Sequence, residues 1–340
     1  MKKFSCFIFL ALIISCKSEN IMKDVPIRLY KPEWEMIIER DTSFKCSFKE
    51  VLNCVDLQII SDTVLVFQGQ IYKDNSNFFY LYSLRNYELI DSFGRKGRGP
   101  DEVYQPCLVP VQSNSYYLCY RDVGKEYIYR DNIFTSQLEG YAIPISNVMS
   151  WLPIGIDKDF YIYFKDNSFI YSICNKTGDV LSEYKLYPEF TEEYYATFLS
   201  SLLTTNEQGR IAEAMVNLPQ INIIDLNSGA KRSIAVDKAY KKWRKMMNKP
   251  FDISTHQYYM AIAPSSEYIF TVYSGATLAE IYQDGNYRNE IHIFDWDGNF
   301  KYRVQIDEHL LRISFDEKQG QLYGIEKETG HIIRYNIFNN

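Results

Sequence analysis

The residues with the clearest chemical potential lie in a glycine-rich basic loop, Phe93–Val103, with the sequence FGRKGRGPDEV. Its glycines permit positive φ angles and a close approach of the backbone, and Arg95, Lys96 and Arg98 supply three cations. Such a loop could cradle a phosphate. However, it lacks the Gly-Lys-Ser/Thr ending of a P-loop, misses the dinucleotide spacing, and no helix pattern follows. The alternative, which we favour, is a turn between two sheets whose charges pair locally.

Other signals for catalysis or metal binding are weak. The sequence has no GxSxG motif, and no carboxylate spacing singles out an acid–base pair. Asp295 and Asp297 resemble part of a calcium loop, but the further acids and the distal Glu are missing, so hairpin turn chemistry explains them better. We therefore assign no catalytic residue, metal ligand or cofactor. The histidines, none of which forms an HxH or HxxxH pair, are His256, His292, His309 and His331.

The elements that must position these residues are β-hairpins, of which Glu290–Ile306 is the clearest. Its sequence, EIHIFDWDGNFKYRVQI, places an Asp-Gly turn between two runs of alternating apolar residues. Asp-Gly between such runs is a strong hairpin signal, because Gly supplies the positive φ that the turn needs. The aromatic share of 16% also favours strands.

Weaker copies of this hairpin recur at intervals of roughly 40–50 residues, which is the period of a four-stranded propeller blade. We predict an all-β fold over residues 41–340: a six-bladed β-propeller of four-stranded antiparallel blades with short helical insertions. A strand at Phe44–Val51 should complete the last blade and close the ring. A β-sandwich followed by a second β domain is the alternative, but sandwiches lack a sustained four-strand period. The copies centre near Phe79, Tyr127, Ile170, Ile221, Ile291 and Ile332.

Two insertions have helical patterns. Glu192–Leu203 has early acids and an apolar stripe, and Asp237–Lys249 has a plausible N-cap followed by many cations. The basic helix has two interpretations. It contacts a membrane surface or an acidic partner, or it packs Tyr240, Trp243 and Met247 on the rim with solvated lysines outside. We prefer the second interpretation.

The N-terminus predicts export and anchoring. Residues 1–15 have two lysines followed by a short apolar stretch, as in a signal peptide. The apolar stretch is followed by Ser15-Cys16. This ending resembles the lipobox of bacterial lipoproteins, which implies cleavage before Cys16 and its lipidation; an ordinary secretory signal is the alternative. Residues 16–40 are then a lipid-anchored tether, and the membrane is a partner through Cys16. No later stretch reaches the ~20 apolar residues of a membrane span.

The net charge is −6 with mixed signs, and this balance gives no indication of nucleic acid binding. The odd number and irregular spacing of the cysteines after Cys16 do not indicate a disulfide framework, although one pair could bridge. Small buried side chains are the preferred interpretation. These cysteines are Cys46, Cys54, Cys107, Cys119 and Cys174.

The pattern GxxGxGPxE at Gly94–Glu102, the hairpin FDWDGNFKYRVQI and the closing QLYGIEKETGHIIRYNIF resemble the six-bladed, TolB-like or NHL-like propeller lipoproteins of bacteroidete-type bacteria. The likeness covers about Phe44 to Phe338, although Val103 stands where the family usually has Phe. It implies the fold and an outer-membrane lipoprotein, facing the periplasm or the surface. It is nearly silent on activity, so no catalytic residue is carried over.

We therefore expect a binding or scaffold module of the cell envelope that recognises a protein, peptide or glycan through its loop face. The alternative is a propeller-type enzyme, a lactonase-like hydrolase or a lyase, with a metal in the central channel. Loop placement and residue type give a shortlist of ligand-binding residues. The shortlist is Arg95, Arg98, Trp151, Tyr195, Trp243 and Tyr273.

Overall fold

The structure is a computed structural model that describes most of the chain after residue 19. The described residues are 20–22, 24–44, 54–70, 77–100, 102–135, 137–142, 148–154, 160–165, 170–175, 179–188, 190, 198–206, 208–285 and 289–338. Side chains are not described for residues 136–139, 141–170 and 174.

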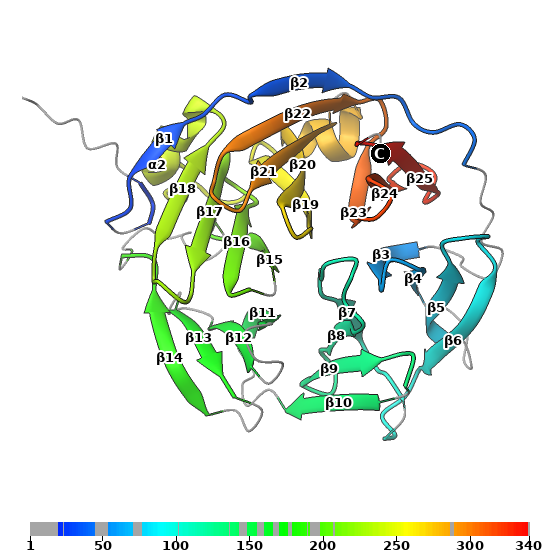
Figure 1. The fold of residues 1–340 in the computed structure, drawn as a ribbon. Helices are drawn as coiled ribbons and strands as arrows, with labels where there is room; N and C mark the ends of the chain where they lie inside the picture. Colours follow the sequence, from blue (N-terminus) through cyan, green and yellow to red (C-terminus); the bar gives the residue numbers. More distant parts are fainter. Residues whose placement is uncertain are drawn as a thin grey trace, which may run out of the picture.

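The described strands form six sheets around a central axis, as in a β-propeller (Figure 1). Within each sheet the strands that follow one another along the chain pair antiparallel, which is what the recurring hairpins predict. The first three sheets consist of β3 (Cys54–Ile60), β4 (Val64–Gly69), β5 (Asn77–Ser83) and β6 (Leu89–Arg95); β7 (Pro106–Leu108), β8 (Leu118–Asp122), β9 (Tyr127–Asn132) and β10 (Gln137–Ala142); and β11 (Val148–Ile154), β12 (Phe160–Lys165), β13 (Ile170–Cys174) and β14 (Val180–Lys185).

The other three sheets have the same order from the axis outward. They consist of β15 (Ser201–Thr205), β16 (Arg210–Met215), β17 (Gln220–Asp225) and β18 (Lys231–Ala235); β19 (His256–Pro264), β20 (Tyr268–Thr277), β21 (Asn289–Asp295) and β22 (Phe300–Ile306); and β23 (Leu310–Asp316), β24 (Gln321–Glu326) and β25 (Ile332–Asn336).

The ring closes where the last sheet meets the first, because β23 packs beside β3. The Ile59 amide donates to Ser314 Oγ at 3.0 Å across this junction. The sixth sheet has three strands in the described part of the chain. Of the strand predicted at Phe44–Val51 to complete it, only Phe44 lies within the described residues.

The segment before the first sheet lies along the outside of the ring (Figure 1). We name residues Asn20–Phe44 the N-terminal strap. Its β1 (Ile27–Leu29) pairs parallel with β18, and its β2 (Trp34–Ile37) pairs parallel with β22. The added strands cover backbone groups that would otherwise form open sheet edges. Within the tether predicted over 16–40, Ile27–Leu29 and Trp34–Ile37 thus belong to two sheets.

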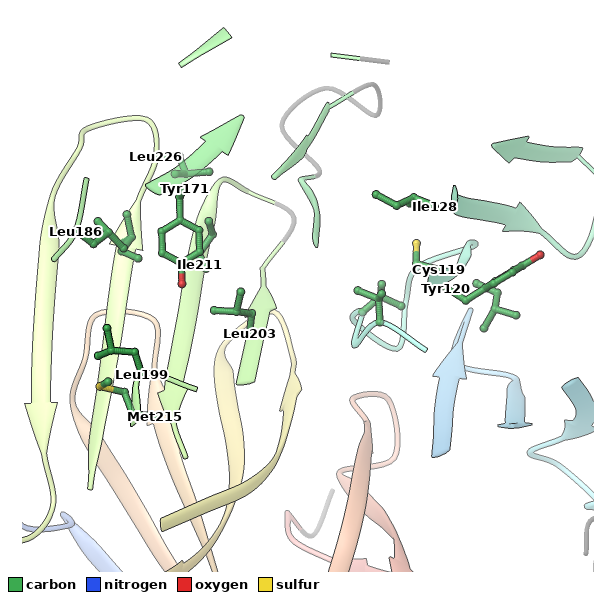
Figure 2. Packing of buried hydrophobic residues seen from close by; sticks show 14 of the residues in the cluster. Cys119, Tyr120, Ile128, Tyr171, Leu186, Leu199, Leu203, Ile211, Met215 and Leu226 are labelled. Carbon is green, nitrogen blue, oxygen red and sulfur yellow. The ribbon is translucent and has the colours of Figure 1, made fainter. Parts of the chain in front are cut away.

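The middle strands of the sheets are more buried than the outer strands. All described residues of β4 are buried, whereas β14 at the outer edge alternates between exposed and half-buried positions. A large apolar cluster links neighbouring sheets, and Figure 2 shows its Leu199 beside Met215, with Ile211 farther along β16 near Tyr171. Middle strands are covered on both faces by the adjacent sheets, which explains their continuous apolar runs.

The helices are short. A 3₁₀ helix at Lys238–Lys242 leads into α2 (Trp243–Met247), and Asp237 caps it by accepting from the Ala239 amide at 2.7 Å. A π-helical turn, η2, spans Glu280–Asp284. The helix predicted at Glu192–Leu203 is wrong at its end, because Ser201–Thr205 form β15. Residues 191–197 lie outside the described residues.

The hairpin Glu290–Ile306 contains the turn predicted at its Asp-Gly sequence. Asp295 Oδ1 accepts from the Asn299 amide at 2.7 Å, and Gly298 has φ +83°. Trp296 is buried against the fourth sheet, and its indole donates to the Ser265 carbonyl at 2.9 Å. Asp295 and Asp297 therefore have turn and surface roles, since Asp297 also pairs with Arg210 at 3.1 Å.

Candidate functional site

A cavity of about 500 Å³ lies on the axis of the ring. Its described lining comes from the first strands of four sheets, β3, β15, β19 and β23, and from β7 and neighbouring residues of the second sheet. The space between first strands is the usual ligand site in barrels and propellers, where loops and strand ends converge. We therefore take this central channel as the candidate site.

One end of the channel is closed by the connection between β7 and β8, Val109–Tyr117, which we name the plug. Figure 1 shows the chain after β7 projecting towards the middle of the ring. The plug bonds to turns of the first and fifth sheets: the Asp62 amide donates to the Ser113 carbonyl at 2.7 Å, and Gln112 Nε2 donates to the Ser265 carbonyl at 3.1 Å. Val109 and Val111 are buried and give this end an apolar floor.

The other end is polar. Asp56 and Arg312 face each other across the junction of β3 and β23, with 3.7 Å between Asp56 Oδ2 and Arg312 Nε. Arg121 and the exposed Cys107 belong to the neighbouring second sheet. The described lining thus carries two guanidinium groups, one carboxylate and one thiol. Because Asp56 lies at the opposite end of β3 from the plug, this end forms the open mouth.

Burial changes the acid–base behaviour of the mouth. It raises the pKa of Asp56 to about 6, and the positive charge of Arg312 only partly opposes this shift. Cys107 is exposed as a residue, but neighbouring side chains partly desolvate its thiol; this desolvation raises the pKa of the thiol, although Arg121 acts in the opposite direction. The carboxyl group of Asp56 is therefore protonated at mildly acidic pH, which leaves the mouth with a larger positive charge.

Two buried glutamines on the wall differ in their bonding. Gln68 Nε2 donates to the Pro106 carbonyl at 2.8 Å, and Gln68 Oε1 accepts from the Leu108 amide at 3.2 Å. Gln58 is only 2% exposed, yet neither its amide nitrogen nor its oxygen has a hydrogen bond in the described protein. Buried amides are normally paired, so Gln58 is an unusual feature beside the mouth.

The glycine-rich loop is not part of this channel. Glu102 folds back over it and accepts from the Gly99 amide at 2.8 Å, and a Cβ on Gly97 would overlap the Glu102 carboxylate. Lys125 Nζ donates to the Gly99 carbonyl at 2.7 Å and also to the carbonyl of Glu102. The motif GxxGxGPxE therefore describes a turn closed by its own glutamate, whose carboxylate bonds to a backbone amide of the loop rather than leaving an open anion cradle.

The shortlisted residues are not gathered in one place. Arg95 ends β6 at the outer edge of the first sheet, and Arg98 lies over the ring of Tyr104 at 4.5 Å. Trp243 in α2 is buried, with 3% of its surface exposed, beyond the fourth sheet. Tyr273 is not in a loop but in β20, where it stacks on the His292 ring at 4.3 Å. Such separate positions do not form a single pocket.

The other two shortlisted residues are only partly placed. Trp151 lies in β11, the first strand of the third sheet, and its side chain is not described. Tyr195 lies outside the described residues. Among the shortlisted residues that the structure describes, Trp151 is the one that lies in the first strand of a sheet.

The shortlist omits the mouth residues because it was chosen by loop placement, whereas these residues lie in strands. Asp56 and Gln58 interrupt the run CVDLQII, and Arg312 interrupts LLRISF. In a propeller the first strand of each blade lines the axis, so polar residues in these strands are the signal that could have identified the site.

The cysteines and metal-binding groups can be placed within the described part of the chain. Cys54, Cys107 and Cys119 occur as thiols there, and Cys46 lies outside it. No three His, Cys, Asp or Glu side chains of the described residues lie close enough to share a metal ion. None of the helices in these residues has the length and apolar character needed to cross a membrane.

The arrangement of sheets agrees with sequence comparison. Residues 57–318 match the family described as TolB-like 6-blade propeller-like. The chain belongs to this family. No curated protein matches it significantly in sequence. The family relationship establishes an all-β propeller and leaves the ligand unassigned.

Solved structures show the same fold at low identity. A Bacteroides fragilis protein described as exported matches with a TM-score of 0.55 and 11% identity, over 88% of this chain and 98% of its own. The Cps50 (Swd1) propeller domain of Myceliophteria thermophila has a TM-score of 0.50 and 10% identity, over 84% and 96%. Raptor of Chaetomium thermophilum has a TM-score of 0.50 and 8% identity, over 92% of this chain and 30% of its own. These likenesses concern the fold alone.

Proposed function

We propose that this protein is a lipid-anchored, six-bladed propeller of the cell envelope that binds a ligand at the open mouth of its channel. The six sheets and the family match support the blade count. The Ser15-Cys16 ending of the apolar N-terminal stretch supports the lipid anchor, on the outer membrane and facing either the periplasm or the surface. The protein acts as a binding or scaffold module rather than as an enzyme.

The observation that carries the ligand site is the unpaired amide of Gln58 in the wall of the cavity. An amide left without partners in the interior costs about 1–3 kcal/mol, so its retention needs a reason other than stability. A ligand that offers both a donor and an acceptor would satisfy it. Gln58 and Asp56 are two residues apart on β3 and share one strand face.

The charges at the mouth indicate the chemistry of that ligand. Arg121 and Arg312 can receive one anionic group, and Asp56 can accept from a hydroxyl or amide donor. A peptide end or an acidic glycan residue carries both kinds of group. A protein partner would insert such a segment from its surface. Within the described residues, no specific observation favours the metal-dependent enzyme.

Calorimetric titration of the mature chain with Cys16→Ser tests this site. The panel contains short peptides with free or amidated carboxyl ends and neutral or acidic oligosaccharides. Arg312→Gln removes a charge-assisted contact, and we expect it to lower affinity about 10- to 100-fold. The matched control, Arg85→Gln, replaces an exposed arginine away from the channel and should leave affinity unchanged.

Two outcomes would contradict the proposal. If binding is unchanged in Arg312→Gln and in Gln58→Leu, the channel mouth is not the site. If Arg95→Gln or Arg98→Gln lowers affinity instead, recognition occurs at the glycine-rich loop of the original shortlist.

A further inference from the structure

A strongly basic surface lies outside the fourth sheet. The basic segment, Lys238–Lys249, carries six cations and no acidic residue. Its lysines and Arg244 are all exposed, whereas Tyr240, Trp243 and Met247 are buried on the opposite side. The two sets alternate at helical spacing, so packing of the apolar side turns the cations outward together.

The packing holds this segment in a fixed position. The Trp243 ring meets Phe190 edge to face at 6.0 Å, and the Arg244 guanidinium lies 4.3 Å over the Trp243 ring. Within the part of the chain that the structure describes, Lys241, Lys242 and Lys245 form no ion pair. Their positive charges are therefore available to an external anion.

The N-terminal strap begins beside the same edge. Asn20 Nδ2 donates to Ser233 Oγ at 2.8 Å, and Gln220 Nε2 donates to Asn20 Oδ1 at 2.9 Å. Met22 is buried and its sulfur accepts from Ser233 Oγ at 3.3 Å. These bonds fix the start of the strap on β17 and β18.

The strap also contacts the basic segment. Tyr240 packs with Ile27 of β1 and Ala235 of β18 in one buried cluster. Ile27 stands opposite Ser233 in the register of β1 and β18, and Ser233 is the residue that binds Asn20. The start of the strap and the basic segment therefore share one edge of the ring, as Figure 1 shows for β1 and α2.

The position of the anchor follows from chain length. Only four residue steps separate Cys16 from Asn20, and four steps span at most about 14 Å when fully extended. A lipid on Cys16 must therefore enter the membrane within that distance of the fixed Asn20. The membrane surface must approach this edge of the ring, and the six cations then lie close to it.

We propose that the basic segment binds the anionic phospholipid headgroups of the membrane that carries the anchor. This inference rests on the proposed lipidation of Cys16. The acyl chains retain the protein, and the cations set its orientation, with the edge formed by the fourth sheet towards the bilayer. Basic residues near an anionic leaflet are attracted individually and screened by salt, so several cations act together.

Vesicle sedimentation of the mature chain with Cys16→Ser tests the segment without the lipid. Neutral phosphatidylcholine vesicles are compared with vesicles that contain phosphatidylglycerol. We expect binding only to the anionic vesicles and its loss at high salt. Replacing three cations, in Lys241→Gln, Lys242→Gln and Lys245→Gln together, should weaken binding about 100-fold.

A control variant with the same change in net charge distinguishes binding by the basic segment from an effect of the overall charge of the protein. It combines Arg85→Gln, Lys96→Gln and Lys318→Gln, three exposed residues on the first and sixth sheets, and should bind within twofold of the parent. The altered residues of both triple variants are exposed, so circular dichroism melts should show unchanged midpoints. Equal weakening in both variants, or equal binding to neutral vesicles, would overturn the proposal.

The anchor is tested separately. Mass spectrometry of the N-terminal peptide from cell membranes reports lipidation of Cys16. Its absence would refute the anchor while leaving the vesicle result to decide on the basic segment. In the lipidated protein on anionic vesicles, Lys241, Lys242 and Lys245 should be protected from acetylation and Lys318 should not; equal modification of all four would refute the orientation.

Discussion

Replacing Gln58 with leucine should make the protein more stable, although the side chain is buried. Each unpaired polar group in an interior costs about 1–3 kcal/mol, and both amide atoms of Gln58 lack a hydrogen bond in the described protein. Leucine has a similar volume and removes both polar atoms. We therefore expect a gain of about 2 kcal/mol in the free energy of unfolding.

The neighbouring glutamine supplies the matched control. Gln68→Leu leaves the Pro106 carbonyl and the Leu108 amide without the bonds that Gln68 makes at 2.8 and 3.2 Å. We expect a loss of about 1–3 kcal/mol from this substitution. The same chemical change in the same wall should thus have opposite effects on stability.

Thermal and urea unfolding of both variants measure the difference. For roughly 300 ordered residues the entropy of unfolding is about 0.6 kcal/mol per kelvin, so 2 kcal/mol corresponds to about 3 °C in Tm. The Tm of Gln58→Leu should be higher than that of the parent by that amount, and the Tm of Gln68→Leu should be lower by about 2–5 °C. A lower Tm in both variants would refute the reasoning, because it would mean that the native fold depends on the Gln58 amide. A higher Tm of Gln58→Leu together with loss of ligand binding would show that Gln58 lowers stability but is needed for binding.

Two further predictions concern the glycine-rich loop and the mouth. Gly97→Ala and Glu102→Ala each remove the bond from the Gly99 amide to the Glu102 carboxylate, so each should cost about 1–2 kcal/mol in urea unfolding. Because both lose the same bond, the double variant should lose clearly less than the sum, and strict additivity would contradict this account. Burial raises the pKa of Asp56 to about 6 in the folded protein, above the value in the unfolded chain. The native state therefore binds this proton more tightly than the unfolded state. As a result, the free energy of unfolding decreases as pH rises from about 4 to 6. Asp56→Asn should therefore be more stable than the parent at pH 7, by at most about 3 kcal/mol, and equal to it near pH 4. A difference that does not change with pH would refute this assignment.

The sheets could be predicted from the sequence because their information is local. Asp295–Asn299 shows this clearly, since the turn residues and the flanking alternation together determine both strands. β15 was harder to predict because Leu202 and Leu203 form a short apolar run that also fits a helix. Its strand state depends on pairing with β16, which the local sequence does not encode.

The strap and the channel mouth depend on distant contacts. Ile27–Leu29 and Trp34–Ile37 lack a strand pattern of their own and are ordered by parallel pairing with β18 and β22. Asp56 and Arg312 come together only when the last sheet meets the first. The residue types were visible in the sequence, but their proximity arises from closure of the ring.

The strap also has a consequence for the order of folding. Asn20 bonds to Ser233, 213 residues later, and Asp41 pairs with Arg334, 293 residues later. The part of the chain that is synthesised first therefore cannot be fixed until almost all of the chain is present. Contacts of such sequence separation form slowly, because the loop-closure entropy must be lost before they contribute. Complete docking of the strap therefore requires the outer strands of the fourth, fifth and sixth sheets, and a chain truncated before residue 231 would lack the strand that pairs with β1.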